Sequence, residues 1–159
     1  MLGIAGLFVC FAGVLFVGAP YLPTLTPQVN AALTLADLQP GQTLLELGCG
    51  DGKVVLAAAK QGIRVIGYEL NPVLAGITWL RTWRYRKLVT VHCADFWRQQ
   101  WPDADAIFTF LLPKYMAKLD KKVIQYAKGD VKVISFAFAI PNRTADAEKA
   151  GVFLYCYRQ

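Results

Sequence analysis

The feature that most constrains this chain is the segment at residues 46–53, Glu-Leu-Gly-Cys-Gly-Asp-Gly-Lys, which lies between two apolar runs. The run before it, residues 44–47, predicts a short buried strand, and the run after it, residues 54–59, predicts a helix. Glycines in such a turn let a ligand approach the backbone where any Cβ would block it. The helix that follows points free N–H groups and the positive end of its dipole at the same place. The segment therefore predicts a ligand-binding turn in an α/β domain.

A second predicted strand, residues 64–69, ends in the carboxylate of Glu69. This acid follows the turn by about 20 residues, which is the spacing of a carboxylate that binds a ribose. A dinucleotide-binding turn of the form G-x-G-x-x-G would need a glycine where this chain has Lys53. The third glycine lies one residue earlier, at Gly52, so the pattern is E-x-G-x-G-x-G. This pattern resembles the first motif of the class I S-adenosylmethionine-dependent methyltransferases.

The resemblance implies S-adenosyl-L-methionine as the cofactor. In that family the glycine turn passes beside the methionine part of the cofactor, and the acid that ends the second strand binds both ribose hydroxyls. An acid just after the third strand accepts a hydrogen bond from the adenine amino group, with an apolar neighbour against the ring. The cofactor-binding residues implied in this chain are Glu46, Gly48, Cys49, Gly50, Gly52, Glu69, Leu70, Asp95 and Phe96.

The rest of the chain alternates predicted strands and helices, as one α/β domain would. Further strands are expected at residues 89–93, 105–110, 131–138 and 151–157, and helices at residues 27–36 (capped by Thr26), 72–87 and from Pro113 onward. This alternation predicts a doubly wound, mostly parallel sheet of the Rossmann-like, class I methyltransferase type. His92 lies within a strand pattern and is expected to be structural. The four cysteines lack metal-ligand spacing, so no metal site is expected.

The first 19 residues contain no charged side chain, and the first charge in the chain is Asp37. Such a run spans roughly 28 Å as a helix, which matches the hydrocarbon core of a bilayer and predicts a transmembrane anchor at residues 1–19. A cleaved signal peptide is disfavoured because no Lys or Arg precedes the run. A Pro-rich linker is expected at residues 20–27, and the methyltransferase domain at residues 28–159. Since all Lys and Arg follow the run, the domain is expected on the cytoplasmic side, at the inner membrane if the source is bacterial.

Basic side chains cluster at residues 81–87 and again between Lys114 and Lys122, in a chain of net charge +6. Such clusters suit nucleic acid, anionic lipid or plain solvent at a helix end. With an anchor at the membrane, lipid contact is favoured over nucleic acid. A monomer is expected.

The chemistry of methyl transfer constrains the substrate side of the site. A lysine amine must be neutral to attack, which costs roughly 4–5 kcal/mol at pH 7 from a reference pKa of about 10.4. Burial and an adjacent sulfonium charge lower that cost, so no strong base is essential. Many amine methyltransferases carry an N/D-P-P-Y-like motif after the fourth strand, where this chain has Phe-Leu-Leu-Pro at residues 110–113. Amide and nucleobase-amine substrates are therefore disfavoured, and Thr109 and Tyr115 remain as the nearby polar candidates for catalysis.

Taken together, the charge-free start, the Pro-Tyr-Leu-Pro-Thr linker, the glycine turn and the Gly-Tyr-Glu-Leu-Asn-Pro segment resemble the small membrane-anchored protein-lysine methyltransferases. Mitochondrial members of that family methylate lysines of the c-ring protein of ATP synthase and of the adenine nucleotide translocase. The resemblance implies a lysine of a membrane protein as the substrate. Two other functions stay open: methylation of a membrane-dissolved quinone or lipid, and a cofactor-binding membrane module without catalysis.

Overall fold

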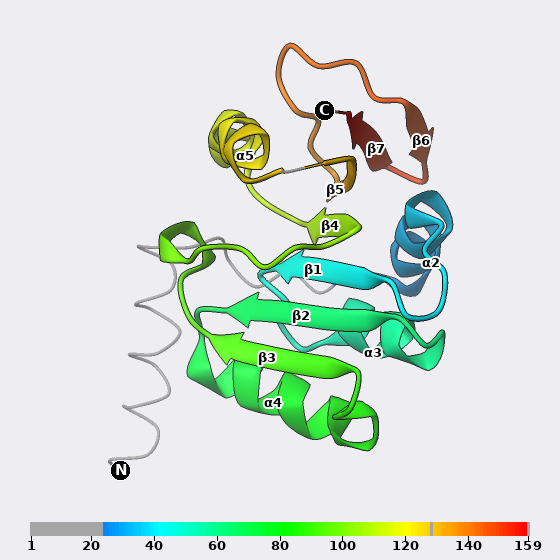
Figure 1. Cartoon of the computed structure of the whole chain (residues 1–159), viewed down its shortest axis with the longest axis vertical. Helices are drawn as coiled ribbons and strands as arrows, with labels where there is room; N and C mark the ends of the chain where they lie inside the picture. The colour runs from blue at the N-terminus through cyan, green and yellow to red at the C-terminus, as the bar shows by residue number, and fades with distance from the viewer. Residues whose placement is uncertain (1–23, 128, 159) are drawn as a thin grey trace.

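The computed structural model describes residues 24–127 and 129–158, and a seven-stranded sheet forms its centre (Figure 1). The strands are β1 (Thr43–Leu47), β2 (Arg64–Glu69), β3 (Val89–Cys93), β4 (Ala106–Thr109), β5 (Val131–Phe136), β6 (Ala147–Lys149) and β7 (Val152–Tyr157). The helices are α2 (Thr26–Ala36), α3 (Lys53–Lys60), α4 (Pro72–Thr82) and α5 (Pro113–Tyr126), with 3-10 turns η1 (Trp83–Tyr85) and η2 (Phe96–Arg98).

The strand order, β3-β2-β1-β4-β5-β7-β6, reverses at β1. Strand β1 pairs in parallel with β2 on one side and with β4 on the other, so that Leu47 lies opposite both Tyr68 and Thr109. Strand β7 runs antiparallel to β5 and to β6. The prediction of a doubly wound, mostly parallel sheet is confirmed. In such sheets, ligands bind at the carboxyl ends of the strands where the order reverses.

The short strand β6 was not predicted. It pairs with β7 through a two-residue turn at Ala150 and Gly151, whose φ values are +53° and +72°. Tight hairpin turns of this kind need positive φ at both positions and usually signal themselves by Asn-Gly or Asp-Gly. Alanine at the first position carries no such signal, so the sequence pattern shows only the longer strand β7.

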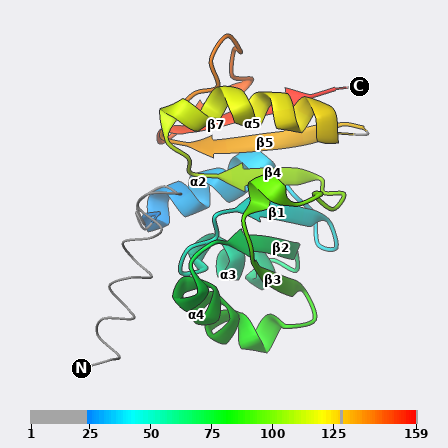
Figure 2. The ribbon, with the colours of Figure 1, turned by 90° about the vertical axis from the view of Figure 1, so that its left-hand side faces the viewer.

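Helices α2, α3 and α4 cover one face of the sheet and α5 covers the other (Figure 2). Successive strand residues face opposite sides, so Leu44 packs in the core beneath α2 and α3 while Leu45 packs beneath α5. Helix α5 contributes Met116, Leu119 and Val123 to its core, all fully buried. These two cores fix the ends of β1, β2 and β4 relative to one another.

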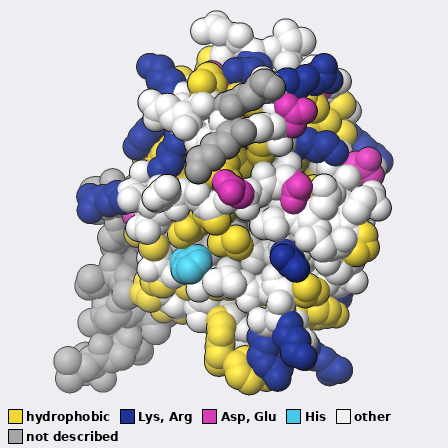
Figure 3. All heavy atoms as spheres, viewed as in Figure 1, with side chains coloured by type: hydrophobic (Ala, Val, Ile, Leu, Met, Phe, Trp, Pro, Cys, Tyr) yellow, Lys and Arg dark blue, Asp and Glu magenta, His cyan; other side chains and the backbone are white. Residues whose placement is uncertain are grey.

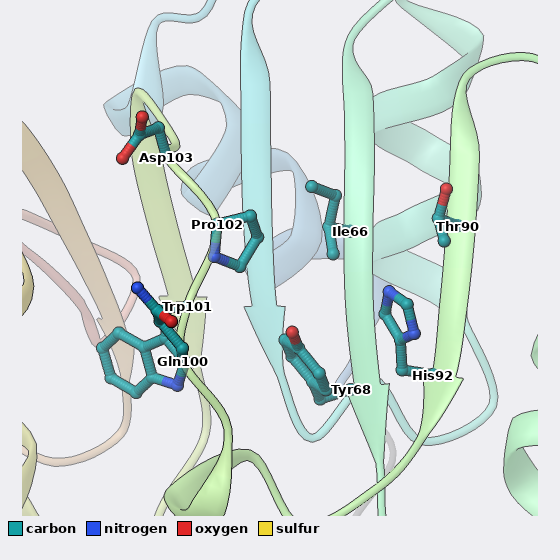
Figure 4. Close-up of a pocket in the computed structure, with 8 residues that line it drawn as sticks. All are labelled: Ile66, Tyr68, Thr90, His92, Gln100, Trp101, Pro102 and Asp103. Carbon is teal, nitrogen blue, oxygen red and sulfur yellow. The ribbon is translucent and has the colours of Figure 1, made fainter.

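The segment between β3 and β4 forms only η2. Within the described residues, no helix covers β2 and β3 on the α5 side of the sheet, and an open pocket of about 430 Å³ lies there (Figure 4). Its lining residues are Ile66, Tyr68, Thr90, His92, Gln100, Trp101, Pro102 and Asp103. His92 stacks on the ring of Tyr68, with 5.1 Å between ring centroids, which agrees with a structural role for this residue.

Two local predictions about helices need correction. Helix α2 begins at Thr26, so Thr26 is its first residue and not its cap; the N-cap is Leu25, which makes no side-chain cap. Helix α4 ends at Thr82 and not near residue 87, and the chain continues as the turn η1. The Thr82 hydroxyl donates to the carbonyl of Thr78, a back-bond that competes with regular helix at this point.

The expected anchor at residues 1–19 and most of the expected linker lie outside the described residues. From residue 24 to 127 and from 129 to 158, no helix has both the length and the apolar character that crossing a bilayer requires.

Candidate active site

The glycine turn between β1 and α3 folds back onto the end of β2. Gly48, Gly50 and Gly52 have φ values of +87°, +53° and +78°, which are left-handed conformations that glycine adopts without strain. The N–H groups of Gly48 and Cys49 both donate to the carbonyl of Tyr68 at 2.9 Å. The N–H of Gly52 donates to the carbonyl of Cys49 at 2.8 Å. The turn is therefore held by backbone hydrogen bonds at the point where the strand order reverses.

The glycines of the turn are required for different reasons. A Cβ on Gly52 would lie 2.6 Å from Cγ2 of Thr78 and 2.8 Å from its Oγ1, so the turn packs tightly against α4 there. Thr78 also donates to the carbonyl of Gly50 at 2.7 Å. A Cβ on Gly48, in contrast, would meet no described heavy atom within 4 Å. The turn thus has one side against α4 and an open side at Gly48.

Glu69, at the end of β2, ties this turn to the start of α4. Its carboxylate accepts hydrogen bonds from the backbone N–H of Gly50 at 2.9 Å and of Asn71 at 2.8 Å. Each carboxylate oxygen has lone pairs beyond the one used, so the group can accept further donors. The sequence prediction that Glu69 lies beside the glycine turn is confirmed as geometry.

Glu46, the first residue of the motif, is buried in β1 with 3% of its surface exposed. Its Oε2 atom has no hydrogen-bond partner among the described residues. Burial raises the pKa of this carboxyl well above its ordinary value, and the nearby carboxylates of Glu69 and Asp51 raise it further. A buried carboxyl oxygen without a donor is costly to the fold unless a ligand supplies one. The site therefore suits a ligand with a positively charged donor.

The Cys49 side chain packs beneath the turn and not into its open side. A Cβ on Gly67 of β2 would lie 3.1 Å from the Cys49 sulfur, so that glycine makes room for it. Burial raises the pKa of the Cys49 thiol, with added effects from Glu46 and Glu69, so the thiol stays neutral. Cys49 thus contributes to the site through its backbone. Within the described residues, no group of His, Cys, Asp and Glu is placed to hold a metal ion.

A second wall follows β3, whose end lies beside Glu69: the N–H of Ala94 donates to the Glu69 carbonyl at 2.9 Å. Asp95 caps the turn η2 by accepting from the N–H of Trp97 at 2.9 Å. Phe96 packs on Trp97, with 4.7 Å between ring centroids. Leu70, which is partly exposed, follows Glu69 in the chain.

Lys122 of α5 holds that wall in place. Its Nζ donates to the carbonyls of Phe96, Trp97 and Gln99 at 3.2, 2.8 and 3.0 Å. Burial and the neighbouring Lys118 lower the pKa of Lys122. One ammonium therefore fixes the segment that carries Asp95 and Phe96.

The third wall, after β4, is aromatic. Phe110 packs on Phe136 and Phe138, at centroid distances of 4.5 and 6.3 Å. Tyr115 lies on the first turn of α5, 6.1 Å from Trp97 between ring centroids. Thr109 is fully buried, and its hydroxyl donates to the Leu47 carbonyl at 3.4 Å. In this arrangement Tyr115 lies at the rim, whereas the Thr109 hydroxyl is held within the sheet.

Three contributors to the site were missed from the sequence. Asn71 caps α4, accepting from the N–H of Val73 at 2.9 Å and of Leu74 at 3.4 Å; its position before a proline at the helix start was the available signal. Its buried Nδ2 has no partner among the described residues. Thr78 and Lys122 reach the site only through the packing of α4 and α5, and no local pattern marks them.

Comparison with known proteins identifies the family. Residues 46–147 match the ANTKMT methyltransferase domain family. The chain is 32% identical over 129 residues to the human (Homo sapiens) lysine N-methyltransferase of the ATP synthase c-ring protein, covering 80% of this chain and 55% of that enzyme. It is 35% identical over 126 residues to the adenine nucleotide translocase lysine N-methyltransferase of Mus musculus, covering 77% and 55%. The chain thus spans about half the length of these curated relatives.

A solved structure agrees with this assignment. The fold is similar to that of an RNA methyltransferase from Salinibacter ruber in complex with S-adenosyl-L-homocysteine, with a TM-score of 0.78 and 27% sequence identity. The similarity covers 86% of this chain and 93% of that one. The sequence prediction from the E-x-G-x-G-x-G motif is confirmed, because the family match begins at Glu46 and includes the whole turn. The chain belongs to the ANTKMT methyltransferase domain family.

Proposed function

We propose that this chain is an S-adenosylmethionine-dependent methyltransferase that acts on a lysine side chain of a membrane protein. When bound, S-adenosylmethionine supplies an electrophilic methyl group on a positively charged sulfonium. The residues present fit such a group. Glu46 offers a buried oxygen without a partner among the described residues, and Gly48 has open space beside its Cα.

Each wall of the site has a role in this proposal. The glycine turn and Glu46 hold the cationic methionine part, because a buried carboxylate gains most from a positive partner. Glu69 accepts hydrogen bonds from the ribose, while its present bonds to Gly50 and Asn71 keep it oriented. Asp95, Phe96 and Leu70 hold the adenine. Lys122 positions Asp95 and Phe96 by fixing their turn.

The observation that carries the lysine proposal is the aromatic wall after β4. Phe110, Phe136 and Phe138 line the edge of the sheet with apolar surface, and residues 110–113 contain no acid or amide side chain. Such a wall packs against the aliphatic stem of a lysine and removes water from its amine. Desolvation disfavours an ammonium, so it helps to supply the neutral amine without a general base. The curated relatives named above are lysine N-methyltransferases, which supports the same substrate.

Tyr115 is the polar side chain we propose at the entrance for that amine. It is partly buried on the first turn of α5, with Lys114 Nζ 4.9 Å from its ring centroid. Thr109 acts indirectly, because its hydroxyl fixes β4 to β1. We also propose that residues 1–19 anchor the chain in a membrane with its domain on the cytoplasmic side.

The test is transfer of a labelled methyl group from S-adenosylmethionine to membranes of cells that lack the gene. After incubation with the full-length chain, protein, lipid and RNA are separated, and the protein is hydrolysed to amino acids. The label is expected in methylated lysine, and Glu69→Ala is expected to abolish it because that carboxylate orients the ribose. Label in the lipid fraction would replace the lysine proposal by a lipid or quinone substrate, and label in RNA by a nucleic-acid substrate.

A further inference from the structure

Helix α4 exposes larger apolar side chains than it buries. Its buried residues are Leu74, Ala75, Thr78 and Thr82, two of which are threonines. Its exposed face, continued by η1, carries Val73, Ile77, Trp79, Leu80 and Trp83. Leu80 is 71% exposed, Trp79 53% and Trp83 47%. A surface helix normally turns its larger apolar residues inward, so this face is built to contact something apolar.

The charge around this face has one sign. No Asp or Glu occurs between Glu69 and Asp95, whereas Arg84, Arg86 and Lys87 follow the exposed tryptophans. Arg86 lies over the Trp83 ring, 5.2 Å from its centroid, and Trp79 packs edge-on against Trp83 at 4.7 Å. In Figure 3, hydrophobic and Lys/Arg side chains gather at the lower end of the molecule, where Figure 1 places α4.

These features decide among three possible occupants. A second copy of this chain would bring the same cations together across a twofold interface, which is unfavourable. Nucleic acid uses cations and aromatic rings but has no partner for the aliphatic stripe of Val73, Ile77 and Leu80. A bilayer surface takes all three kinds of group: aliphatic side chains among the acyl chains, tryptophans at the headgroup level, and cations against anionic lipid.

We propose that the outer face of α4 and η1 is a docking surface for the interface of an anionic bilayer. The tips of Ile77, Trp79, Leu80 and Trp83 enter the interfacial layer, and Arg84, Arg86 and Lys87 contact lipid headgroups. Each cation near an anionic surface favours binding by about fivefold. This proposal does not depend on methyl transfer, since lipid contact needs neither cofactor nor substrate.

The docking face has a direct consequence for the candidate site. The opposite side of α4 contacts the glycine turn: Thr78 donates to Gly50, and Arg81 donates to the carbonyl and carboxylate of Asp51 at 2.8 and 2.6 Å. One helix, about 10 Å across, therefore separates the glycine turn from the lipid headgroups. A substrate segment at the membrane surface would meet the site without leaving that layer.

Tryptophan quenching by lipid tests the proposal in the full-length chain. Residues 1–23 contain no tryptophan, so the N-terminal run does not contribute to the signal. Trp79 and Trp83 are two of the four tryptophans, and up to half of the emission is open to quenching. In vesicles of phosphatidylglycerol with phosphatidylcholine brominated on its acyl chains, we expect strong quenching that is lost in W79F/W83F. In pure phosphatidylcholine we expect weaker quenching.

Two variants with matched controls separate the contributions. R84E/R86E/K87E is expected to reduce quenching in anionic vesicles to the level in neutral ones, whereas K60E/R64E/K149E changes the net charge equally at exposed sites elsewhere and should preserve it. Leu80→Ser should weaken quenching, and Ile124→Ser, which alters an exposed residue of α5, should not. Circular dichroism checks that each variant is folded.

Three results would overturn the proposal. They are no quenching in anionic vesicles, quenching that survives W79F/W83F, and equal loss in the R84E/R86E/K87E variant and its matched control. Concentration-dependent dimers that dissociate on Leu80→Ser would instead assign the face to a second copy of the chain.

Discussion

Gly52 and Gly48 share the left-handed backbone but differ in what surrounds them. A side chain at Gly52 would collide with Thr78, whereas one at Gly48 would enter open space. The same substitution at the two positions therefore separates packing within the fold from access by a ligand.

We predict that Gly52→Ala destabilises the fold more than Gly48→Ala does. Both variants place alanine at positive φ, which costs about 1–2 kcal/mol. Only Gly52→Ala adds overpacking against Thr78, worth about 1–3 kcal/mol more. Gly48→Ala should remain folded but bind S-adenosylhomocysteine poorly. Denaturant unfolding and calorimetry measure the two effects, and full affinity in Gly48→Ala would show that the ligand does not lie beside that glycine.

The buried carboxyl of Glu46 predicts a pH dependence. Its pKa is raised in the folded chain, so between its ordinary value near 4.5 and the raised value the folded state binds more protons than the unfolded state. Stability contributed by this group therefore falls as pH rises through that window. A cationic ligand favours the carboxylate, so its binding should release a proton and tighten with increasing pH there.

Glu46→Gln should remove both effects. Thermal unfolding across pH measures the first, and calorimetric titration with S-adenosylhomocysteine in two buffers of different ionisation enthalpy measures the second. Identical pH profiles for wild type and Glu46→Gln would show that the carboxyl does not govern this behaviour.

At the scale of elements, the local parts of the site were predictable and the long-range parts were not. The strand, the glycine turn and Glu69 follow from short patterns, because each residue acts within its own element. Lys122 lies on a helix whose spacing gives no hint that it reaches the carbonyls of residues 96–99. The spacing of Leu74, Ile77, Leu80 and Trp83 predicted a helix, but three of these four residues face outward. Periodicity identifies an apolar face without identifying what covers it.

We predict that Lys122→Met weakens cofactor binding through the wall that it supports. Methionine keeps an apolar stem but loses the ammonium that donates to three carbonyls. Hydrogen bonds from charged groups contribute about 1.5–3 kcal/mol each, so amide exchange at residues 96–99 should accelerate. Affinity for S-adenosylhomocysteine should fall roughly tenfold, which is about 1.4 kcal/mol. Lys121→Met, at the exposed neighbouring position, is the control; equal effects in both would refute a specific role for Lys122.

At the scale of the whole molecule, the helices are distributed unevenly over the sheet. Helices α2, α3 and α4 cover one face, and within the described residues α5 alone covers part of the other (Figure 2). The sequence predicted the alternation of strands and helices, and the doubly wound sheet follows from it. It did not predict the bare area beside Tyr68 and His92, because residues 94–105 have no strand or helix period that marks a missing helix. The site thus opens between a covered face that carries α4 and a less covered one.

The central claim is methylation of a lysine on a membrane protein, and the most direct measurement is mass-spectrometric mapping of methyllysine in whole cells. Three strains are compared: one with the gene, one without it, and one that carries Gly48→Ala, which should be folded but inactive. The account predicts that specific methyllysines on membrane proteins disappear without the gene and are restored by wild type alone. Lost sites confined to soluble proteins, no lost sites, or full restoration by Gly48→Ala would contradict it.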